Sequence, residues 1–324
     1  MSKTRGCGEL SLRISVTDRC QLRCLYCMPP EGILRLPREN VLTFEEILRF
    51  VRAVRKHFTV TKVHLTGGEP LIRRGIVELV NHLAAEGIGD LALTTNGIQL
   101  AEMAAGLKRA GLRRININLP TLDAQLYAML TRGGAIASVL AGIAAARAAG
   151  FYPVKLNVVV LRGLNDGEVT HLARFALENS CVVRFLELMP LGCAQSIFAA
   201  RFVPTAAVRS RLAAEFRLRP CPTLPGGTSC DFVAESKDGL RGAIGFISSC
   251  SKPFCRGCRR IRLTSTGEVI GCLSRGQSLE ARDLLRANGD DAAAALATLL
   301  MRALAAKGRR PVYQSSRLMA CVGG

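Results

Sequence analysis

Three cysteines near the start of the chain have a spacing suited to a metal cluster. Cys20, Cys24 and Cys27 form a C-x3-C-x2-C pattern in a loop that follows a short apolar run. Three thiolates on one loop can bind three irons of a 4Fe–4S cube and leave the fourth iron open for a ligand from outside the protein. Structural zinc takes four protein ligands, and no fourth Cys or His lies in this loop. The pattern therefore favours an iron–sulfur cluster with an open iron.

A second cysteine triplet lies near the other end of the chain. Cys255, Cys258 and Cys272 have the spacing C-x2-C-x13-C, which again supplies three thiolates and implies a second open cluster. Spacing alone also allows a zinc site with a fourth cysteine ligand. The candidates for that fourth ligand are Cys230, Cys250 and Cys321.

The second triplet lies within a run of basic residues. No acidic residue occurs between positions 252 and 262, and the run contains Lys252, Arg256, Arg259, Arg260 and Arg262. A solvated basic face would have the same composition. Beside an open iron, however, arginine side chains are suited to binding phosphates in a bidentate manner, so the run predicts an anionic ligand here.

Composition narrows the class of protein. The chain has 324 residues, of which 49% are apolar and 21% charged, so we expect a globular protein of one large domain or about two ordinary ones. It has 13 cysteines and no long apolar leader or spanning segment, which predicts a reducing cytoplasm, no membrane partner, and thiols used as metal ligands. The net charge of +19 fits nucleic acid or a polyanionic small substrate, but 5% aromatic residues disfavour single-stranded nucleic acid.

The elements that must position these residues alternate between strand and helix. β-Rich runs predict strands at residues 12–16, 60–65, 91–94, 114–119, 154–160 and 182–188. Helical spacing predicts helices at residues 43–58, with a Thr43–Glu46 capping box, and at 76–85, 100–110, 124–149 and 166–179. This alternation predicts parallel β/α units. Beyond Arg219 the pattern breaks, so we expect one domain over residues 1–225, a second over 226–324, and a helical tail over 279–306.

The first cysteine loop, with Tyr26 inside it and a Gly67-Gly68-Glu69-Pro70 turn after it, resembles the radical S-adenosylmethionine (SAM) superfamily. Over nearly the full length, the order of motifs is similar to that of the GTP 3′,8-cyclase family of molybdenum cofactor (molybdopterin) biosynthesis. The motifs that carry this resemblance lie at residues 15–20, 66–71, 93–97, 113–116, 184–189, 254–258 and 323–324.

The resemblance implies an α/β fold, a partial (β/α)6 TIM-type barrel with a C-terminal auxiliary iron–sulfur cluster extension. It implies two 4Fe–4S clusters, on Cys20, Cys24 and Cys27 and on Cys255, Cys258 and Cys272, with SAM as cofactor. The implied SAM contacts are Tyr26, Gly68, Asn118 and Met189. The implied GTP contacts are Arg13, His64, Thr94, Lys155, Arg184, Arg260, Ile261 and Arg262, with Arg260 and Arg262 as catalytic residues.

The implied reaction is that of a lyase. A 5′-deoxyadenosyl radical made from SAM removes the ribose 3′ hydrogen of GTP, and the carbon radical attacks C8 to give (8S)-3′,8-cyclo-7,8-dihydroguanosine 5′-triphosphate. The implied partners are GTP, a flavodoxin- or ferredoxin-type reductant and a downstream cyclic pyranopterin monophosphate synthase. A homodimer stays open, and nucleic acid is disfavoured as a partner. The terminal glycines match a family tail that reaches into the active site, where glycine can approach a ligand closely.

Three positions depart from the family pattern. His64 replaces an arginine, which weakens one phosphate-facing charge because histidine is largely neutral at pH 7. Asn118 and Pro120 stand where Ser and Asp are usual, and residues 191–202 form a shortened segment. These changes keep open a paralogue with an altered substrate. The sequence also leaves open an RNA-modifying radical SAM enzyme and a zinc-stabilised nucleic-acid-binding module.

Overall fold

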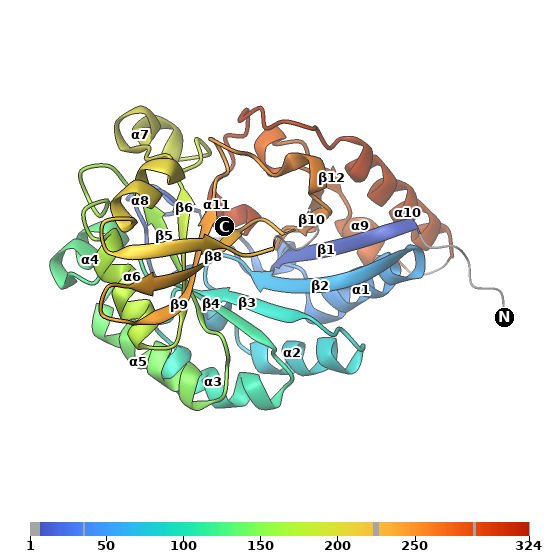
Figure 1. Cartoon of the computed structure of the whole chain (residues 1–324). Coiled ribbons are helices and arrows are strands. Elements are labelled where there is room, and N and C mark those ends of the chain that lie inside the picture. Colours follow the sequence, from blue (N-terminus) through green and yellow to red (C-terminus); the bar gives the residue numbers. More distant parts are fainter. Residues whose placement is uncertain (1–6, 35, 223–226, 288–289, 324) are drawn as a thin grey trace.

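The computed structural model describes residues 7–34, 36–222, 227–287 and 290–323. In this part of the chain twelve strands form one sheet, in the order β12-β11-β10-β1-β2-β3-β4-β5-β6-β9-β8-β7 (Figure 1). The strands are β1 (Cys7–Ser15), β2 (Phe58–Thr66), β3 (Leu91–Thr95), β4 (Arg114–Asn118), β5 (Lys155–Val160), β6 (Val182–Glu187), β7 (Phe216–Pro220), β8 (Cys230–Ser236), β9 (Arg241–Ile247), β10 (Arg260–Leu263), β11 (Glu268–Ile270) and β12 (Leu279–Glu280). The α-helices are α1 (Phe44–His57), α2 (Ile76–Ala85), α3 (Leu100–Arg109), α4 (Ala124–Thr131), α5 (Ile136–Ala148), α6 (Val169–Glu178), α7 (Ala194–Arg201), α8 (Thr205–Leu212), α9 (Arg282–Arg286), α10 (Asp290–Ala305) and α11 (Met319–Val322).

Strands β1 to β6 are neighbours in chain order, and each pair of neighbours is parallel. At least one helix follows each of them, as the strand–helix alternation predicts. Helix α1 begins with the predicted capping box, in which Thr43 Oγ1 accepts from the Glu46 amide and Glu46 accepts from the Thr43 amide. The apolar residues of strands and helices, such as Leu12 and Phe50, are buried in one core. The chain is therefore a mixed α/β protein with parallel β/α units.

The later strands extend this parallel sheet at both of its edges. β9 pairs in parallel with β6, with Phe185 opposite Phe246, and antiparallel β8 and β7 follow outward. At the other edge β10 pairs in parallel with β1, with Leu12 opposite Ile261, and β11 and β12 follow. The C-terminal third thus continues the sheet, and the expected domain boundary between residues 225 and 226 lies outside the described residues.

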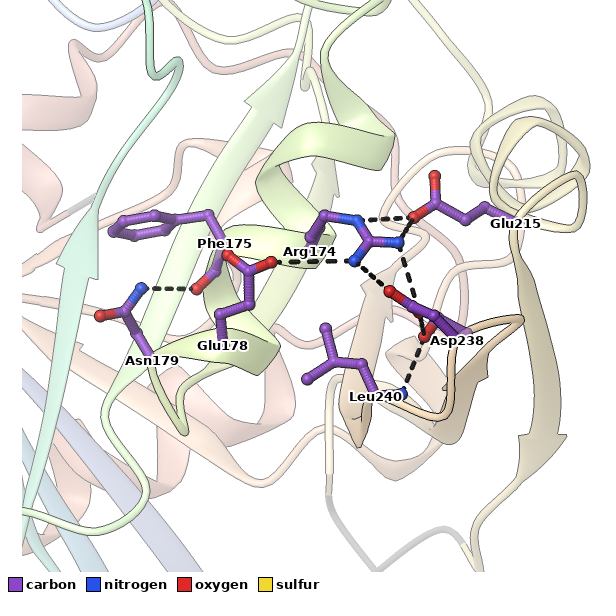
Figure 2. Close-up of polar contacts among 8 residues, drawn as sticks. Arg174, Phe175, Glu178, Asn179, Glu215, Asp238 and Leu240 are labelled. Carbon is purple, nitrogen blue, oxygen red and sulfur yellow. Dashed lines mark hydrogen bonds and ion pairs between the residues drawn. The ribbon is translucent and has the colours of Figure 1, made fainter.

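An ion-pair network connects α6 to the segments next to β7, β8 and β9 (Figure 2). Arg174 of α6 donates from Nε to Glu215 Oε1 at 2.8 Å and from Nη1 to Asp238 Oδ2 at 2.9 Å. Glu178, one turn further along α6, lies 3.8 Å from the same guanidinium group. Arg174 lowers the pKa of the Asp238 carboxyl to about 2 by hydrogen bonding. The network joins the segment before β7 and the β8–β9 turn to a helix of the parallel core.

The expected helical tail over residues 279–306 is only partly helical, so that prediction was wrong at its start. Leu279 pairs with Val269 in β12, and helices α9 and α10 follow as separate elements. A free sheet edge at β11 recruits Leu279 into a strand, which outweighs its local helix preference. Within the described residues no single helix is long and apolar enough to cross a membrane, although α4 and α5, bent by 98°, pass that test together.

Candidate active site

The first cysteine loop lies directly after β1 and packs against the turn that follows β2. The amides of Gly68 and Glu69 donate to the carbonyls of Thr17 and Arg19, each at 2.8 Å. A Cβ on Gly67 would lie 2.4 Å from Thr17 O, and one on Gly68 would lie 2.3 Å from Arg19 O. The paired glycines are therefore required because two backbone segments approach each other closely here.

Glu69 connects this turn to Thr95 and Asn96 at the end of β3, and Asn96 in turn lies beside Cys20. Its side chain is buried, with 1% exposed, and accepts from Thr95 Oγ1 at 2.7 Å, the Asn96 amide at 2.6 Å and the Leu71 amide at 3.0 Å. Burial raises the pKa of Glu69 to about 7. Asn96 Oδ1 accepts from the Ile98 amide at 3.1 Å, and Asn96 Nδ2 lies 3.9 Å from Cys20 Sγ. The turn after β2 thus fixes an N–H donor beside Cys20.

The three thiols of the loop are half-buried and close enough to influence one another. Burial raises the pKa of Cys20 to about 11 and that of Cys24 to about 12, and the Cys20 thiolate adds to the effect on Cys24. Burial and the neighbouring thiols also raise the pKa of Cys27. The Leu22 amide donates to Cys20 Sγ at 3.4 Å. Three crowded thiolates with N–H donors suit a cationic iron centre that neutralises them.

The four implied SAM contacts lie at the carboxyl ends of β1, β2, β4 and β6. Tyr26 follows β1, Gly68 follows β2, Asn118 ends β4 and Met189 follows β6. Tyr26 and Asn118 touch, because Asn118 Nδ2 donates to Tyr26 Oη at 3.0 Å. In parallel β/α sheets ligands bind at this edge. The arrangement brings the four residues to one edge of the sheet.

Most of the implied GTP contacts lie on one face of the sheet, across neighbouring strands. β-Pairing places Arg13 opposite both Arg262 and His64, Thr94 opposite Asn116, and Asn116 opposite Lys155. Arg184 lies opposite Asn157 and donates a 2.7 Å hydrogen bond to Asn116 Oδ1, one strand beyond β5. We call the set of basic side chains on this face, which spans more than one register position, the basic row; its charged or titratable members are Arg13, Lys62, His64, Lys155, Arg184, Arg260 and Arg262.

The basic row concentrates positive charge where solvent is scarce. Burial lowers the pKa of Arg184 to about 10 and that of Arg262 to about 9, and Arg260 adds to the effect on Arg262. Burial, and to a lesser extent repulsion from Arg262 and Arg260, lowers the pKa of Arg13. Crowded cations of this kind are stabilised by a polyanionic ligand.

Sequence reasoning missed one member of the row and included one residue that faces away from it. Lys62 lies two residues before His64 on β2, and therefore on the same face of the strand; burial and Arg114 lower its pKa to about 7. The i, i+2 spacing from His64 is the signal that could have identified it. Ile261, between Arg260 and Arg262, is fully buried in the core, so its side chain points to the opposite face.

His64 is kept neutral by its burial and by its neighbours. Its Nε2 lies 2.6 Å from Thr94 Oγ1 and 3.1 Å from Asn116 Nδ2. Because Arg184 can only donate, its bond to Asn116 Oδ1 turns the amide nitrogen of Asn116 toward His64. His64 Nε2 is therefore an acceptor. Burial, and to a lesser extent repulsion from the charge of Arg13, lowers the pKa of the imidazole well below its usual value.

The second cysteine triplet lies at the β10–β11 hairpin. Cys255 begins a short 3-10 turn (Cys255–Gly257), and the Cys258 amide donates to Cys255 O at 3.2 Å. Arg262 pairs with Ile270 across the hairpin, which brings Cys272 back toward Cys258. Burial and the other two thiols raise the pKa of Cys255. Burial would raise the pKa of Cys258 as well, but Lys307 and Arg260 together lower it below its usual value.

The C-terminal tail reaches the basic row. Arg262, with 6% exposed, donates from Nη1 to Val322 O at 3.1 Å and to Gly323 O at 2.5 Å. Gly323 has a φ of +73°, and a Cβ there would lie 2.4 Å from Thr66 Cγ2. The α11 helix lies near the centre of the view among the strands (Figure 1). Gly323 of the tail thus lies beside Arg262, one of the implied GTP contacts, whereas Gly324 lies outside the described residues.

Two further cysteines lie near the first triplet. Cys193 and Cys321 both contribute to the raised pKa of the Cys27 thiol. Cys250, an expected candidate for a zinc ligand, instead donates its thiol hydrogen to Leu188 O at 3.4 Å, and Cys230 is exposed on β8. Among the residues that the structure describes, no group of three or more His, Cys, Asp or Glu side chains is arranged to hold a metal ion.

Two models of known protein families match successive parts of the chain. Residues 14–176 match the family model described as the Radical SAM superfamily, and residues 181–312 match the one described as Molybdenum Cofactor Synthesis C. The chain is 43% identical over 319 residues to the GTP 3′,8-cyclase of Pelotomaculum thermopropionicum, with 97% of each chain covered. It is 42% identical to that of Moorella thermoacetica with the same coverage, and 44% identical over 276 residues to that of Geobacter sulfurreducens, with 85% and 83% covered.

Among solved structures, Streptococcus suis SuiB bound to its precursor peptide SuiA is similar in fold. The TM-score is 0.59 and the identity 18%, over 87% of this chain and 65% of that chain. At this identity the likeness concerns the fold alone.

Proposed function

The chain belongs to the radical SAM superfamily and, within it, to the GTP 3′,8-cyclase family, and we propose that it converts GTP to (8S)-3′,8-cyclo-7,8-dihydroguanosine 5′-triphosphate in molybdenum cofactor biosynthesis. The observation that carries the proposal is the basic row in a chain that also has two cysteine triplets. The row offers a polyanion a buried cationic site on the strands that adjoin the two cysteine loops.

We propose that Cys20, Cys24 and Cys27 hold the first 4Fe–4S cluster. The fit is supported by their half-burial, by the N–H donors beside Cys20 and by the close packing of Gly67 and Gly68 on the loop. When bound, this cluster and SAM supply a 5′-deoxyadenosyl radical. Tyr26, Gly68, Asn118 and Met189 would bind and orient SAM at the carboxyl edge of the sheet.

We propose that Cys255, Cys258 and Cys272 hold the second cluster beside the guanine end of GTP. The hairpin returns Cys272 toward Cys258, and Lys307 and Arg260 supply positive charge to Cys258. Arg260 and Arg262 follow this loop directly on β10, so a nucleotide bound at the second cluster would have its phosphates within reach of the basic row. Arg260 and Arg262 would stabilise the charge of the bound triphosphate, which is the role of the proposed catalytic arginines.

We propose that the remaining GTP contacts come from Arg13, His64, Thr94, Lys155 and Arg184. Arg13, Lys155 and Arg184 would pair with phosphate oxygens, and Lys62 extends the same surface. His64 would contribute a hydrogen bond without a charge, because its neighbours hold it neutral. Ile261 would contribute only through its backbone, because its side chain is in the core. The tail carbonyls that occupy Arg262 would give way to phosphate oxygens when GTP binds.

We also propose that β1–β6 form a partial (β/α)6 barrel and that the chain divides into residues 1–225 and 226–324. We propose a flavodoxin- or ferredoxin-type reductant, a downstream cyclic pyranopterin monophosphate synthase and a cytoplasmic location. The unbroken parallel order of β1–β6 supports the first of these.

The decisive experiment incubates anaerobically reconstituted, reduced protein with SAM and GTP. We expect 5′-deoxyadenosine together with a cyclised guanosine triphosphate product. If 5′-deoxyadenosine forms only slowly with GTP and rapidly with another nucleotide or an RNA, a paralogue with an altered substrate replaces the cyclase proposal. Salt-dependent binding to tRNA that GTP cannot compete with would favour an RNA-modifying enzyme.

A further inference from the structure

Lys307 reaches from the segment after α10 to the second cysteine triplet. Its Nζ lies 3.5 Å from Cys258 Sγ and donates a 2.6 Å hydrogen bond to Arg260 O. We infer that Lys307 is a positioning residue of the second cluster, which donates a charge-assisted hydrogen bond to the Cys258 sulfur and thereby raises the reduction potential of that cluster. The inference rests on the proposed assignment of a cluster to Cys255, Cys258 and Cys272.

The backbone around Lys307 is fixed by close contacts on two sides. A Cβ on Gly271, the residue before Cys272, would lie 1.9 Å from Ala303 O, so the end of β11 and α10 touch through this glycine. A Cβ on Gly308 would lie 2.1 Å from the guanidinium group of Arg275. The Lys307 amide donates to Leu304 O at 3.1 Å. These contacts place the lysine stem between helix and hairpin, so the ammonium group is directed by the fold.

The second hydrogen bond of the lysine fixes its position relative to the cysteine. Arg260 O belongs to the residue two positions after Cys258, and a single ammonium group bridges this carbonyl and the Cys258 sulfur. Lys307 is half-buried, which reduces the screening of its charge by solvent. Cys272 Sγ lies 3.3 Å from the hydroxyl of Ser274, a neutral partner. The hydrogen bond of the lysine is therefore directed at one sulfur of the three, and its charge also acts on Cys255.

The effect on a bound cluster follows from electrostatics. Reduction adds one negative charge to a cluster that its thiolates already make anionic, and a nearby cation stabilises the reduced form more than the oxidised form. Hydrogen bonds to cluster sulfurs act in the same direction. Lys307 would therefore make the second cluster easier to reduce, from a position about fifty residues after Cys258 and outside the three-cysteine motif.

The test compares Lys307→Met, Lys307→Gln and Lys307→Arg in the full-length protein, reconstituted anaerobically. Electron paramagnetic resonance during a redox titration reports each cluster, and a Cys24→Ser, Cys27→Ser background isolates the second. At a fixed potential we expect the reduced-to-oxidised ratio of the second cluster to fall about tenfold in Lys307→Met, which is about 59 mV for a one-electron couple. The ratio in Lys307→Gln should lie between those of Lys307→Met and the wild type, and the ratio in Lys307→Arg should stay near that of the wild type.

Two controls separate this inference from the proposal on which it rests. Lys237→Met makes the same change at an exposed turn between β8 and β9 and should leave both potentials unchanged, as should the first cluster in every Lys307 variant. About four irons per wild-type chain, without a second-cluster signal, would refute the second cluster itself. About eight irons with an unmoved second potential in Lys307→Met would refute the role of Lys307 alone.

Loss of the second cluster from a variant is also informative. If Lys307→Met and Lys307→Gln both lose it while Lys307→Arg keeps it at the wild-type potential, the positive charge at this position is required and the inference stands. If Lys307→Gln keeps the cluster at the wild-type potential, the ammonium charge has no electrostatic effect and the inference is wrong.

Discussion

Arg184 donates a 2.7 Å hydrogen bond to Asn116 Oδ1, and this bond fixes which end of the Asn116 amide faces His64, two strands further along the sheet. The amide nitrogen of Asn116 is turned toward His64 Nε2, which must therefore accept. His64 is thus a neutral hydrogen-bond acceptor whose partner Asn116 is oriented by an arginine from β6.

We expect His64→Ala to weaken GTP binding much less than Arg184→Ala. A neutral hydrogen bond contributes about 1 kcal/mol, so KM for GTP should rise by about fivefold in His64→Ala. Loss of a buried cation paired with phosphate costs about 2–5 kcal/mol, so Arg184→Ala should raise KM at least about thirtyfold. Steady-state kinetics with saturating SAM measures both, and equal effects would show that His64 is charged in the complex.

The pH dependence of GTP binding should depend on Lys62. Burial lowers the pKa of this lysine to about 7, so it loses its proton as pH rises through 7, and only the protonated form attracts a triphosphate. We expect kcat/KM for GTP to fall above pH 7, by at most about tenfold per pH unit for one group.

Lys62→Met should bind GTP more weakly at pH 6.5 and remove this slope, whereas Lys155→Met should weaken binding and keep the slope. A profile from pH 6 to 9 with SAM cleavage measured in parallel separates binding from radical formation. A wild-type profile that stays flat between pH 7 and 8.5 would contradict the assignment.

Gly68→Ala should cost the protein its first cluster. The added methyl group would lie 2.3 Å from Arg19 O, and relief of this clash must push the turn away from the cysteine loop, at a cost of about 1–3 kcal/mol. We expect iron content to fall by about half and 5′-deoxyadenosine formation to cease. Gly106→Ala is the matched control, because its Cβ meets open space in α3 and should raise stability by up to about 1 kcal/mol. Thermal unfolding and iron analysis check both variants.

Single cysteine changes should separate the two clusters. Cys27→Ser should abolish SAM cleavage, because the first cluster no longer has three thiolates. Cys255→Ser should keep SAM cleavage and lose GTP cyclisation, with about four irons in place of about eight. Full cyclisation by Cys255→Ser would show that the second triplet is structural.

Gly323→Ala should disturb the tail without unfolding the protein. Its φ of +73° disfavours any side chain, and a Cβ would meet the methyl group of Thr66. Because the tail carbonyls bind Arg262, we expect reduced GTP turnover with an unchanged melting temperature and iron content. A fall in iron content would mean that the tail supports a cluster instead.

Local sequence signals predicted the parallel core well. The spacing of apolar residues predicted helix α2 at both ends and located β3 to within one residue, and the capping box located the start of α1. Both cysteine triplets were recognisable because their ligands are close in sequence. These features depend on neighbours along the chain, which the sequence displays directly.

Contacts between residues that are far apart in the sequence could not be predicted from local signals. Nothing local indicates that Ile261 pairs with Leu12, or that Leu279 joins β11 as a strand instead of starting a helix. Lys62 was missed because its relevance depends on burial. The neutrality of His64 depends on its burial and on the Asn116 amide, which Arg184 orients from two strands away. The contact between Lys307 and Cys258 requires the close approach of α10 to Gly271, which the sequence alone does not display.

The position of β9 and β10 at opposite edges of the parallel core has a consequence for synthesis. A chain that has emerged only as far as α8 contains β1 to β6 but neither of the strands that cover β1 and β6. Two hydrogen-bonding edges are then open to other chains, which is the usual route to edge-to-edge aggregation. The last hundred residues therefore protect the nascent sheet as well as complete the site, and truncations in this region should aggregate before they lose their parallel core.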